Sequence, residues 1–319
     1  MNGYVIREQI IQAVRAFFDE KKFHEVIVPV LNDAIPAEPT ITPFSTEWQT
    51  NHGTQMLYLS TSPERALKKA LAKNLGNCFA IGHSFRNLEN SGNQHSPEFL
   101  MLEWYRKDST YQDIMHDVQL LLLFVKKRID IFLNRPVSNT VIYQNKKIAL
   151  DKKWHIFSVP DVLRKYSDID LSKVLDDSDL LREAAAKGYA VEDATWEQLF
   201  NQIFLNEVEP NLPSDPFFLT HFPARISPLC AVDTQRRYLA QRFEVFVAGM
   251  ELGNGNTENT DASQVKKYFQ RNTVLPIDED FLAALEKMNG TSYAGIGLGL
   301  DRLAMFFADT TQIKDVSEL

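Results

Sequence analysis

Two pairs of strand-like segments follow each other as hairpins in this sequence, and this pattern restricts the fold more than any other feature. Residues 78–86 and 98–105 flank a polar loop, and residues 241–247 and 249–252 flank a turn at Ala248-Gly249. Strands joined as hairpins pair antiparallel, whereas parallel strands need a crossover connection between them. The sequence therefore predicts an α+β fold with an antiparallel sheet flanked by helices, and it disfavours a doubly wound parallel fold.

Periodicity places the remaining elements around this sheet. Apolar residues at helical spacing predict a helix at 5–21, and alternating valines predict a strand at 23–30, which Pro29 restricts to an edge. Residues 32–47 have a loop-like composition, and residues 151–216 are interpreted as a mostly helical insertion in a single domain spanning residues 1–319. The other expected elements are helices opening at Ser62-Pro63-Glu64 and covering 110–133, 261–271 and 280–288, a strand at 292–298, and a final helix capped by Asp301.

The composition argues against several classes of protein. The net charge of −8 and a pI near 5.5 disfavour a general nucleic-acid-binding surface, which is normally basic. Two distant cysteines, Cys78 and Cys230, provide neither a disulfide framework nor a metal-binding pair, which favours a reducing compartment. The first residues lack the apolar core of a signal peptide, and the most apolar run, 120–125, is far too short to cross a bilayer. We therefore expect a cytoplasmic protein with no membrane segment.

Arg86 is the first candidate for a binding residue. It ends a strand in which its neighbours on the same face, Gly82 and Ser84, are small and leave room for a ligand. A guanidinium group in this position can grip a phosphate with two parallel hydrogen bonds. The alternative is a surface ion pair with Glu89.

The strand at 98–105 is the second candidate. Alternation puts Phe99, Met101, Glu103 and Tyr105 on one face, and apolar side chains occupy the other. A carboxylate removed from water needs a partner, and beside a tyrosine ring it can bind an ammonium group. The alternative is a solvated strand face.

Two carboxylates around a Gly-Asn-Gly turn form the third candidate. Glu251 and Glu258 lie seven residues apart, and the small residues between them let the backbone approach a ligand. Sparse carboxylates of this kind hold Mg²⁺ on phosphates, with water and phosphate completing the coordination. The alternative is an ordinary turn with solvated acids.

A glycine-rich strand before the last helix is the fourth candidate. Gly295, Gly297 and Gly299 do not match a dinucleotide-binding fingerprint, and no strand–helix–strand unit follows them. We interpret them as keeping one strand free of side chains so that a substrate can lie on it. Arg302 then stands in the first turn of a helix, where backbone N–H groups also favour anions. The alternative is glycine used only for tight packing.

Taken together, these segments resemble the catalytic core of class II aminoacyl-tRNA synthetases of the lysine subgroup. Residues 24–29 are similar to motif 1, which builds a dimer interface; Ser84-Phe-Arg86-Asn with residues 95–105 is similar to motif 2; and residues 297–303 are similar to motif 3. The motifs occur in family order over nearly the whole chain, and the similarity is weakest in residues 151–216. The resemblance implies a homodimeric ligase that uses ATP and Mg²⁺.

The resemblance also implies a role for each matching residue. The implied ATP site contains the catalytic pair Arg86 and Arg302 on the α- and γ-phosphates, Phe99 on the adenine, His95 near the distal phosphates, and Asn87, Glu89, Leu252 and Gly299. The implied Mg²⁺ ligands are Glu251 and Glu258. The implied amino-acid site contains Ser62 and Glu64 at the backbone amine, and Glu103, Tyr105, Asn254, Glu258 and Gly297 around the rest of the substrate.

The length of the chain narrows the resemblance. Motif 1 begins almost at Met1, so we expect no anticodon-binding domain, as in the truncated relatives of lysyl-tRNA synthetase that lysylate elongation factor P. This implies lysine or β-lysine as the substrate and a lysine side chain of elongation factor P as the acceptor, with tRNA disfavoured. Two alternatives stay open: a synthetase-like enzyme that acylates tRNA or a small molecule, and a catalytically inactive regulatory paralogue.

Some positions depart from the family pattern. Leu88 replaces a glutamate that serves adenine recognition, Ser96 replaces an asparagine, and Asn256 replaces an aromatic residue of the amino-acid pocket. Gly297 stands where the elongation factor P ligases usually carry alanine. Because one methyl group beside the substrate's α-carbon can separate α- from β-amines, we expect α-lysine to be accepted better than in those relatives. The alternative is that Gly297 only relieves crowding with Asn256 or another neighbour.

Overall fold

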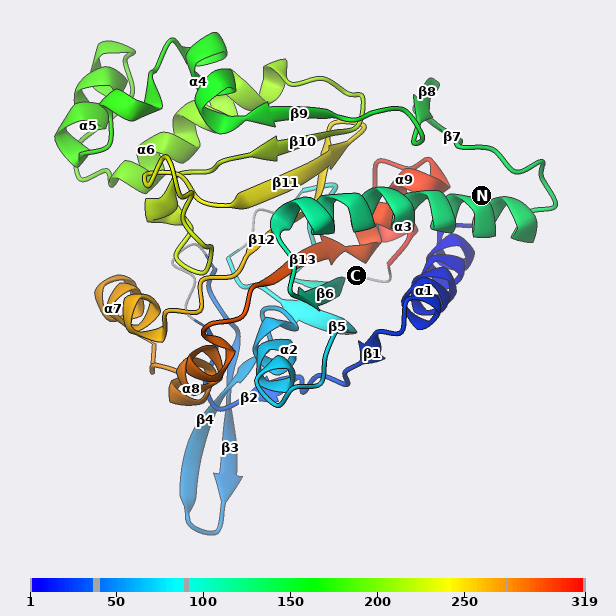
Figure 1. Cartoon of the computed structure of the whole chain (residues 1–319), viewed down its shortest axis with the longest axis horizontal. Helices are drawn as coiled ribbons and strands as arrows, with labels where there is room; N and C mark the ends of the chain where they lie inside the picture. The colour runs from blue at the N-terminus through cyan, green and yellow to red at the C-terminus, as the bar shows by residue number, and fades with distance from the viewer. Residues whose placement is uncertain (1, 37–40, 89–91, 274, 318–319) are drawn as a thin grey trace.

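The computed structural model describes residues 2–36, 41–88, 92–273 and 275–317. Its centre is a mixed, mostly antiparallel sheet in which eight described strands are hydrogen-bonded side by side (Figure 1). In spatial order these strands are β1 (His24–Glu25), β5 (Cys78–Phe85), β6 (Glu98–Lys107), β13 (Tyr293–Gly299), β12 (Met250–Thr257), β11 (Arg242–Val247), β10 (Phe217–Thr220) and β9 (His155–Ser158).

Both predicted hairpins are confirmed. β5 pairs antiparallel with β6, and β11 pairs antiparallel with β12. The second hairpin turns at Ala248 and Gly249, whose φ angles of 57° and 78° match the twist that a two-residue hairpin loop requires. Parallel pairs occur only at the two edges of the described sheet, β1 with β5 and β10 with β9. The expected α+β class with an antiparallel sheet and flanking helices is therefore confirmed.

Three helices form one layer against the middle of the sheet (Figure 1). The predicted first helix is α1, whose apolar face, including Ile10 and Phe18, is buried against the other two. Leu102 and Trp104 of β6 point toward these helices and belong to the same core, on the face that the alternation predicted to be apolar. Because this layer covers one sheet face, the face that carries Glu103 and Tyr105 is left for a site. The three helices are α1 (Gly3–Glu20), α3 (Tyr111–Phe132) and α9 (Leu300–Ala308).

Residues 151–216 are mostly helical and lie at one end of the sheet (Figure 1). Their helices build a second core that continues into the sheet, where the rings of Phe217 and Phe246 stack 4.9 Å apart. The helices of this region are α4 (Val159–Ser167), α5 (Asp177–Ala186) and α6 (Trp196–Ile203). Three further helices pack near the other end: α2 (Glu64–Leu71), α7 (Ala262–Asn272) and α8 (Glu279–Met288).

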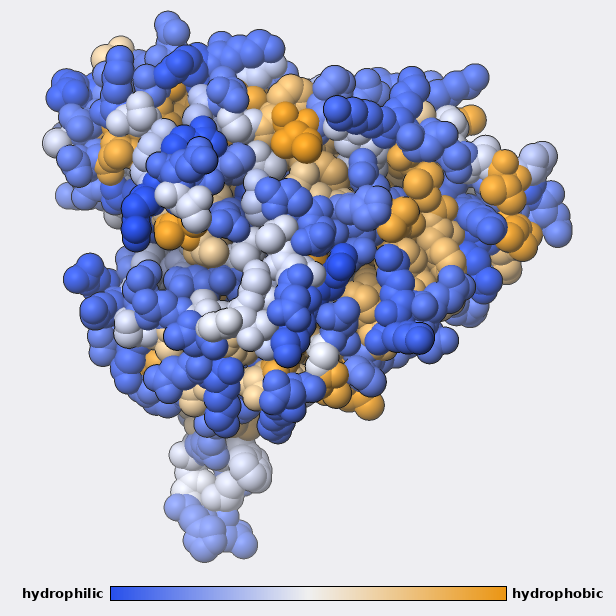
Figure 2. All heavy atoms as spheres, in the orientation of Figure 1, coloured by the Kyte–Doolittle hydropathy of each residue, from blue (hydrophilic) through white to orange (hydrophobic). Residues whose placement is uncertain are grey.

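An arm that the sequence analysis did not predict projects from the body (Figure 1). Asn32 and residues 45–47, which were expected to belong to a loop, form part of its strands, and its surface is coloured blue to white in Figure 2. Trp48 and Met56 on the arm are 56% and 46% exposed. The arm consists of β2 (Leu31–Asn32), β3 (Ser45–Thr50) and β4 (Gly53–Leu59), and a separate hairpin is formed by β7 (Thr140–Tyr143) and β8 (Lys146–Ala149).

Two local expectations are wrong. The strand expected at 23–30 is reduced to the two residues of β1, because the chain leaves β5 after Val26 and Val30 instead accepts a hydrogen bond from the Ser60 backbone. β1 lies at the edge of the sheet, the position to which Pro29 restricted it. Asp301 does not cap the last helix: Gly299 is the N-cap, and the Asp301 carboxylate accepts hydrogen bonds from Arg7 at 2.6 Å and from the Leu100 backbone at 2.7 Å. Asp301 therefore ties α9 to α1 and β6.

Among the described residues, no helix combines the length and apolar character needed to cross a bilayer.

Candidate active site

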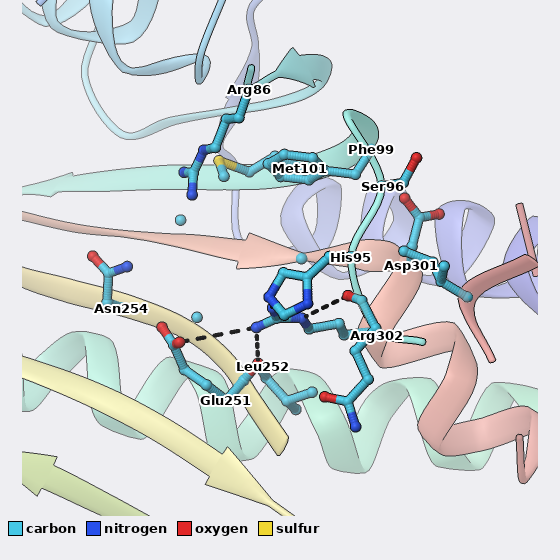
Figure 3. Close-up of a pocket in the computed structure, with 15 residues that line it drawn as sticks. Arg86, His95, Ser96, Phe99, Met101, Glu251, Leu252, Asn254, Asp301 and Arg302 are labelled. Carbon is cyan, nitrogen blue, oxygen red and sulfur yellow. Dashed lines mark hydrogen bonds and ion pairs between the residues drawn. The ribbon is translucent and has the colours of Figure 1, made fainter. Parts of the chain in front are cut away.

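The candidate site is a cavity on the sheet face that the layer of α1, α3 and α9 leaves uncovered (Figure 3), and its empty space, including the part open to solvent, is about 790 Å³. β6, β12 and β13 supply its floor, and the segment after β5 and the start of α9 supply its walls. The residues lining it include Arg86, His95, Ser96, Phe99, Met101, Glu251, Leu252, Asn254, Gly297, Gly299, Asp301 and Arg302.

The two predicted catalytic arginines reach this cavity from different elements. Arg86 follows β5, and its guanidinium carbon lies 5.2 Å from the centre of the Phe99 ring. Arg302 stands in the first turn of α9, where it donates to the Glu251 carbonyl at 2.8 Å and lies 2.9 Å from the His95 ring nitrogen Nε2. Figure 3 shows both side chains directed into the same space. Two fixed cations on either side of one cavity can hold a polyphosphate.

One carboxylate lines the cavity beside Arg302, and a second lies on the next strand. Glu251 Oε2 lies 3.9 Å from Arg302 Nη1, and the side chain is 35% exposed. Glu244 on the neighbouring strand β11 is paired with Arg242 at 2.8 Å. Burial, and then the nearby charge of Glu251, raise the pKa of Glu244 to about 8. A divalent cation between two such carboxylates would relieve their repulsion.

Alternating residues on β6, β13 and β12 form rows across the sheet, at the cavity and beside it. Glu103, Gly297 and Asn254 form one row, and Tyr105, Gly295 and Asn256 form the next. The glycines play different parts in these rows. A Cβ on Gly295 would lie 2.3 Å from the Tyr105 ring, so this glycine is required by packing, whereas Gly297 and Gly299 line the cavity itself.

A buried group of charged residues lies further along the same strands; we call it the acid cage. It consists of Glu64, Lys68, Glu103, Tyr105 and Glu258. The Lys68 ammonium contacts Glu64 and Glu258, each at 2.6 Å, and the Tyr105 hydroxyl donates to Glu103 at 2.6 Å. Burial raises the pKa of Glu103 well above its usual value, and it raises that of Glu258 to about 7.

The structure separates the two carboxylates that the sequence analysis placed at the metal. Glu251 lines the cavity, whereas Glu258 is 6% exposed and bound by Lys68 and by the Asn256 amide at 2.9 Å. Asn256, which replaces the aromatic residue of the family pattern, therefore donates a hydrogen bond to a carboxylate of the cage. Ser62 accepts a hydrogen bond from the Glu64 backbone at 3.3 Å, so it stands at the start of α2 beside the cage.

The remaining predicted residues lie around the loop after β5. The Asn87 side chain accepts a hydrogen bond from the Leu88 backbone, and Leu88 is 82% exposed with a φ of 58°. Ser96 is buried and lines the cavity. Glu89 lies outside the described residues.

Sequence reasoning missed Lys68 and Glu244. Lys68 lies four residues after Glu64 in the helix that opens at Ser62, so the two side chains share a helix face. This spacing is a signal of their contact that the sequence analysis did not use. Glu244 alternates with apolar residues in the strand at 241–247, so its place on one strand face was also visible.

Comparison with known proteins gives one consistent result. Residues 2–319 match the family of class II tRNA synthetases (D, K and N). The chain is 33% identical to an elongation factor P–(R)-beta-lysine ligase of Proteus mirabilis, over 97% of this chain and 92% of that protein. It is 33% identical to a protein of the same description from Haemophilus influenzae, over 99% of this chain and 94% of that protein. It is 32% identical to a lysine–tRNA ligase of Buchnera aphidicola, over 97% of this chain and 61% of that protein.

Proposed function

The chain belongs to the class II tRNA synthetase family of the D, K and N type, and from this premise we propose that it is an ATP-dependent ligase that activates lysine or β-lysine and transfers it to a lysine side chain of elongation factor P. The family supports the adenylate-forming chemistry. The similarity to elongation factor P–(R)-beta-lysine ligases over nearly their whole length supports the acceptor.

One observation carries the proposal: a cavity flanked by two arginines adjoins an acid cage on the same strands. Phe99 and Met101 of β6 face the cavity, and Glu103 and Tyr105, the next residues on that strand face, belong to the cage. A substrate that carries both a carboxylate and an ammonium group fits this arrangement. Its carboxylate can meet ATP between the arginines while its ammonium reaches the cage.

The proposed reaction needs no protein nucleophile. A carboxylate oxygen of the amino acid attacks the α-phosphorus of ATP, the bond to pyrophosphate breaks, and an aminoacyl-adenylate forms. The amine of the acceptor then attacks the acyl carbon, AMP leaves, and the nitrogen releases a proton. Arg86 and Arg302 contribute by holding the phosphates and by stabilising the charge that develops on them.

We propose Glu251 and Glu244 as the residues that hold Mg²⁺. The raised pKa of Glu244 beside Glu251 fits a site that receives a divalent cation, whereas Glu258 is engaged by Lys68. When bound, Mg²⁺ neutralises phosphate charge and orients the leaving pyrophosphate.

We also propose a homodimer and a cytoplasmic location. The sequence predicted a dimer contact through the first helix and the strand at Pro29, but the apolar face of α1 is buried in the chain's own core. We therefore assign the contact to the exposed side chains Ile27, Leu31, Trp48 and Met56. The described cysteines Cys78 and Cys230 are free and buried, which suits a reducing compartment. We further propose the domain organisation predicted from the sequence: a single domain with a mostly helical insertion at 151–216.

The test is pyrophosphate exchange followed by acyl transfer. ATP–pyrophosphate exchange should respond to lysine or β-lysine in a panel of amino acids, and labelled amino acid should then appear on elongation factor P. Because a lysine–tRNA ligase is 32% identical to the chain, tRNA is the acceptor to compare in the same assay. Rapid, salt-sensitive aminoacylation of tRNA would replace elongation factor P as the acceptor. A lack of exchange with every amino acid would favour an inactive paralogue.

A further inference from the structure

Lys68 is a fully buried lysine in the middle of α2, with 0% of its surface exposed. Lysine is almost never fully buried unless its charge is paired. Here the ammonium bridges two carboxylates from different elements, Glu64 one helical turn earlier and Glu258 just after β12. The rings of Phe281 and Tyr105 lie 5.3 and 5.8 Å from Nζ.

These contacts keep the Lys68 ammonium charged. Burial lowers the pKa of Lys68, but the charges and hydrogen bonds of Glu258 and Glu64 raise it by more, so the net shift is upward. Lys68 therefore acts as a fixed cation between two carboxylates, and it cannot accept a proton from a substrate.

The acid cage still holds more carboxylates than cations. Glu103 is 4% exposed, its Oε1 accepts from Tyr105, and its Oε2 has no hydrogen-bond partner among the described residues. Glu103 lies in the same sheet row as Gly297 and Asn254, which line the cavity. One cation is thus built into the cage, and a carboxylate oxygen without a hydrogen-bond partner belongs to the residue that shares a sheet row with two cavity-lining residues.

We infer that Lys68 is a positioning residue: its ammonium neutralises and fixes Glu64 and Glu258, so that the cage presents a defined set of oxygens to the substrate's ammonium groups. This inference rests on the proposed activation of lysine or β-lysine. Without the Lys68 charge, two neighbouring buried carboxylates would repel each other, and one would take up a proton or turn away. The substrate's ammonium group would then bind between Glu64 and Glu258, in the place of the lost Lys68 ammonium, and the substrate would be misplaced.

Lys68→Met tests the inference because methionine keeps an unbranched side chain and removes the charge. We expect the KM for the amino acid to rise at least tenfold in ATP–pyrophosphate exchange, while the KM for ATP stays within twofold. Lys69→Met is the matched control: the next residue makes a partly exposed ion pair with Asp280, and its loss should leave both values unchanged. An unchanged KM for the amino acid in Lys68→Met would overturn the inference. A lowered KM would also overturn it, because it would mean that Lys68 competes with the substrate.

A second experiment separates positioning from a merely structural role. Lys68→Ala removes a propylammonium-sized fragment, so n-propylammonium should restore part of the exchange activity, whereas n-propanol should not. Failure of n-propylammonium to restore activity in the folded variant would contradict the role of the charge. If Lys68→Met is too unstable to purify, the charge-balanced variant Lys68→Met/Glu64→Gln carries the KM comparison with Glu64→Gln alone as its reference. Exchange by the unmodified chain is measured first: its absence with every diamino acid refutes the proposed function, whereas normal exchange with unaffected variants refutes only the role of Lys68.

Discussion

Replacing Gly297 by alanine changes the floor of the proposed amino-acid pocket by one methyl group. Gly297 lies between Glu103 and Asn254 in the sheet. A Cβ there would lie 3.2 Å from Met101 Sδ and 3.9 Å from Met101 Cε, and these are the only atoms of the described residues within 4 Å. The methyl group would therefore press on one flexible side chain and otherwise occupy space in the cavity.

The effect on folding should be small. A contact of 3.2 Å is a few tenths of an ångström shorter than an optimal contact, and an unbranched methionine can move by that amount. Alanine also reduces the entropy of the unfolded chain, which stabilises a protein by about 0.4–1 kcal/mol where the backbone permits it. These two terms are of opposite sign and similar size, so the Gly297→Ala variant should fold with nearly unchanged stability.

The effect on substrate choice should be larger. If the strand lies beside the α-carbon of the substrate, the new methyl group disfavours an amine at that carbon more than an amine one carbon further along. A methylene-sized difference in a close pocket is worth about 1–3 kcal/mol, or about 10- to 200-fold. We therefore expect the preference for α-lysine over (R)-β-lysine, expressed as the ratio of kcat/KM, to fall by at least about tenfold in Gly297→Ala.

The assay is ATP–pyrophosphate exchange with both amino acids, for the unmodified chain and for Gly297→Ala. The KM for ATP serves as the internal control and should not change. A strong preference of the unmodified chain for β-lysine would refute the argument, since the space left by glycine would then have no effect on the choice. An unchanged ratio in Gly297→Ala would show that the glycine only relieves crowding against Met101.

Three further predictions follow from single contacts. Arg302→Ala should lower kcat/KM for exchange about 100-fold or more through lost charge stabilisation, and unchanged exchange kinetics would remove Arg302 from the catalytic pair. Asp301→Asn breaks the 2.6 Å ion pair with partly exposed Arg7. The free energy of unfolding, measured by urea denaturation, should fall by about 1–3 kcal/mol. Equal stability of the variant would contradict the link between α9 and α1. Trp48→Asp should convert the dimer into a monomer, as measured by light scattering. The control Ile142→Asp replaces a side chain that is 59% exposed and lies away from the arm, and it should leave the dimer intact. An unmodified chain that is fully active as a monomer would contradict the proposed dimer.

The predictable part of the fold consists of elements whose signal is local. The two hairpins and the helices α1 and α3 follow from periodicity and turn residues, and the structure confirms them. The arm formed by β2, β3 and β4 was missed because its strands are largely exposed and lack a buried alternating face. The strand at 23–30 was too long because alternation alone does not show where an edge strand leaves its neighbour.

The predictable part of the site consists of residues that match a pattern in a fixed order. Arg86 and Arg302 lie more than 200 residues apart in the sequence and line one cavity. Local patterns do not show that such distant residues are close in space, so this proximity was expected only from the resemblance to the synthetases. Lys68 could not be found in this way. Its role depends on a contact with Glu258, which lies 190 residues away in the sequence. Without that contact, a lysine on a helix is expected to be exposed to solvent.

The acid cage also bears on whether the chain is an inactive paralogue. Burying carboxylates costs free energy unless each is paired, and here three carboxylates surround a single lysine. A fold that needed only stability would gain from replacing Glu103 by an apolar residue, because its Oε2 has no hydrogen-bond partner among the described groups. A buried carboxyl group with a strongly raised pKa and an oxygen without a hydrogen-bond partner is characteristic of sites that receive a charged ligand. Because Glu103 continues the strand face that lines the arginine-flanked cavity, the cost of the cage is best explained by a substrate whose ammonium group completes it.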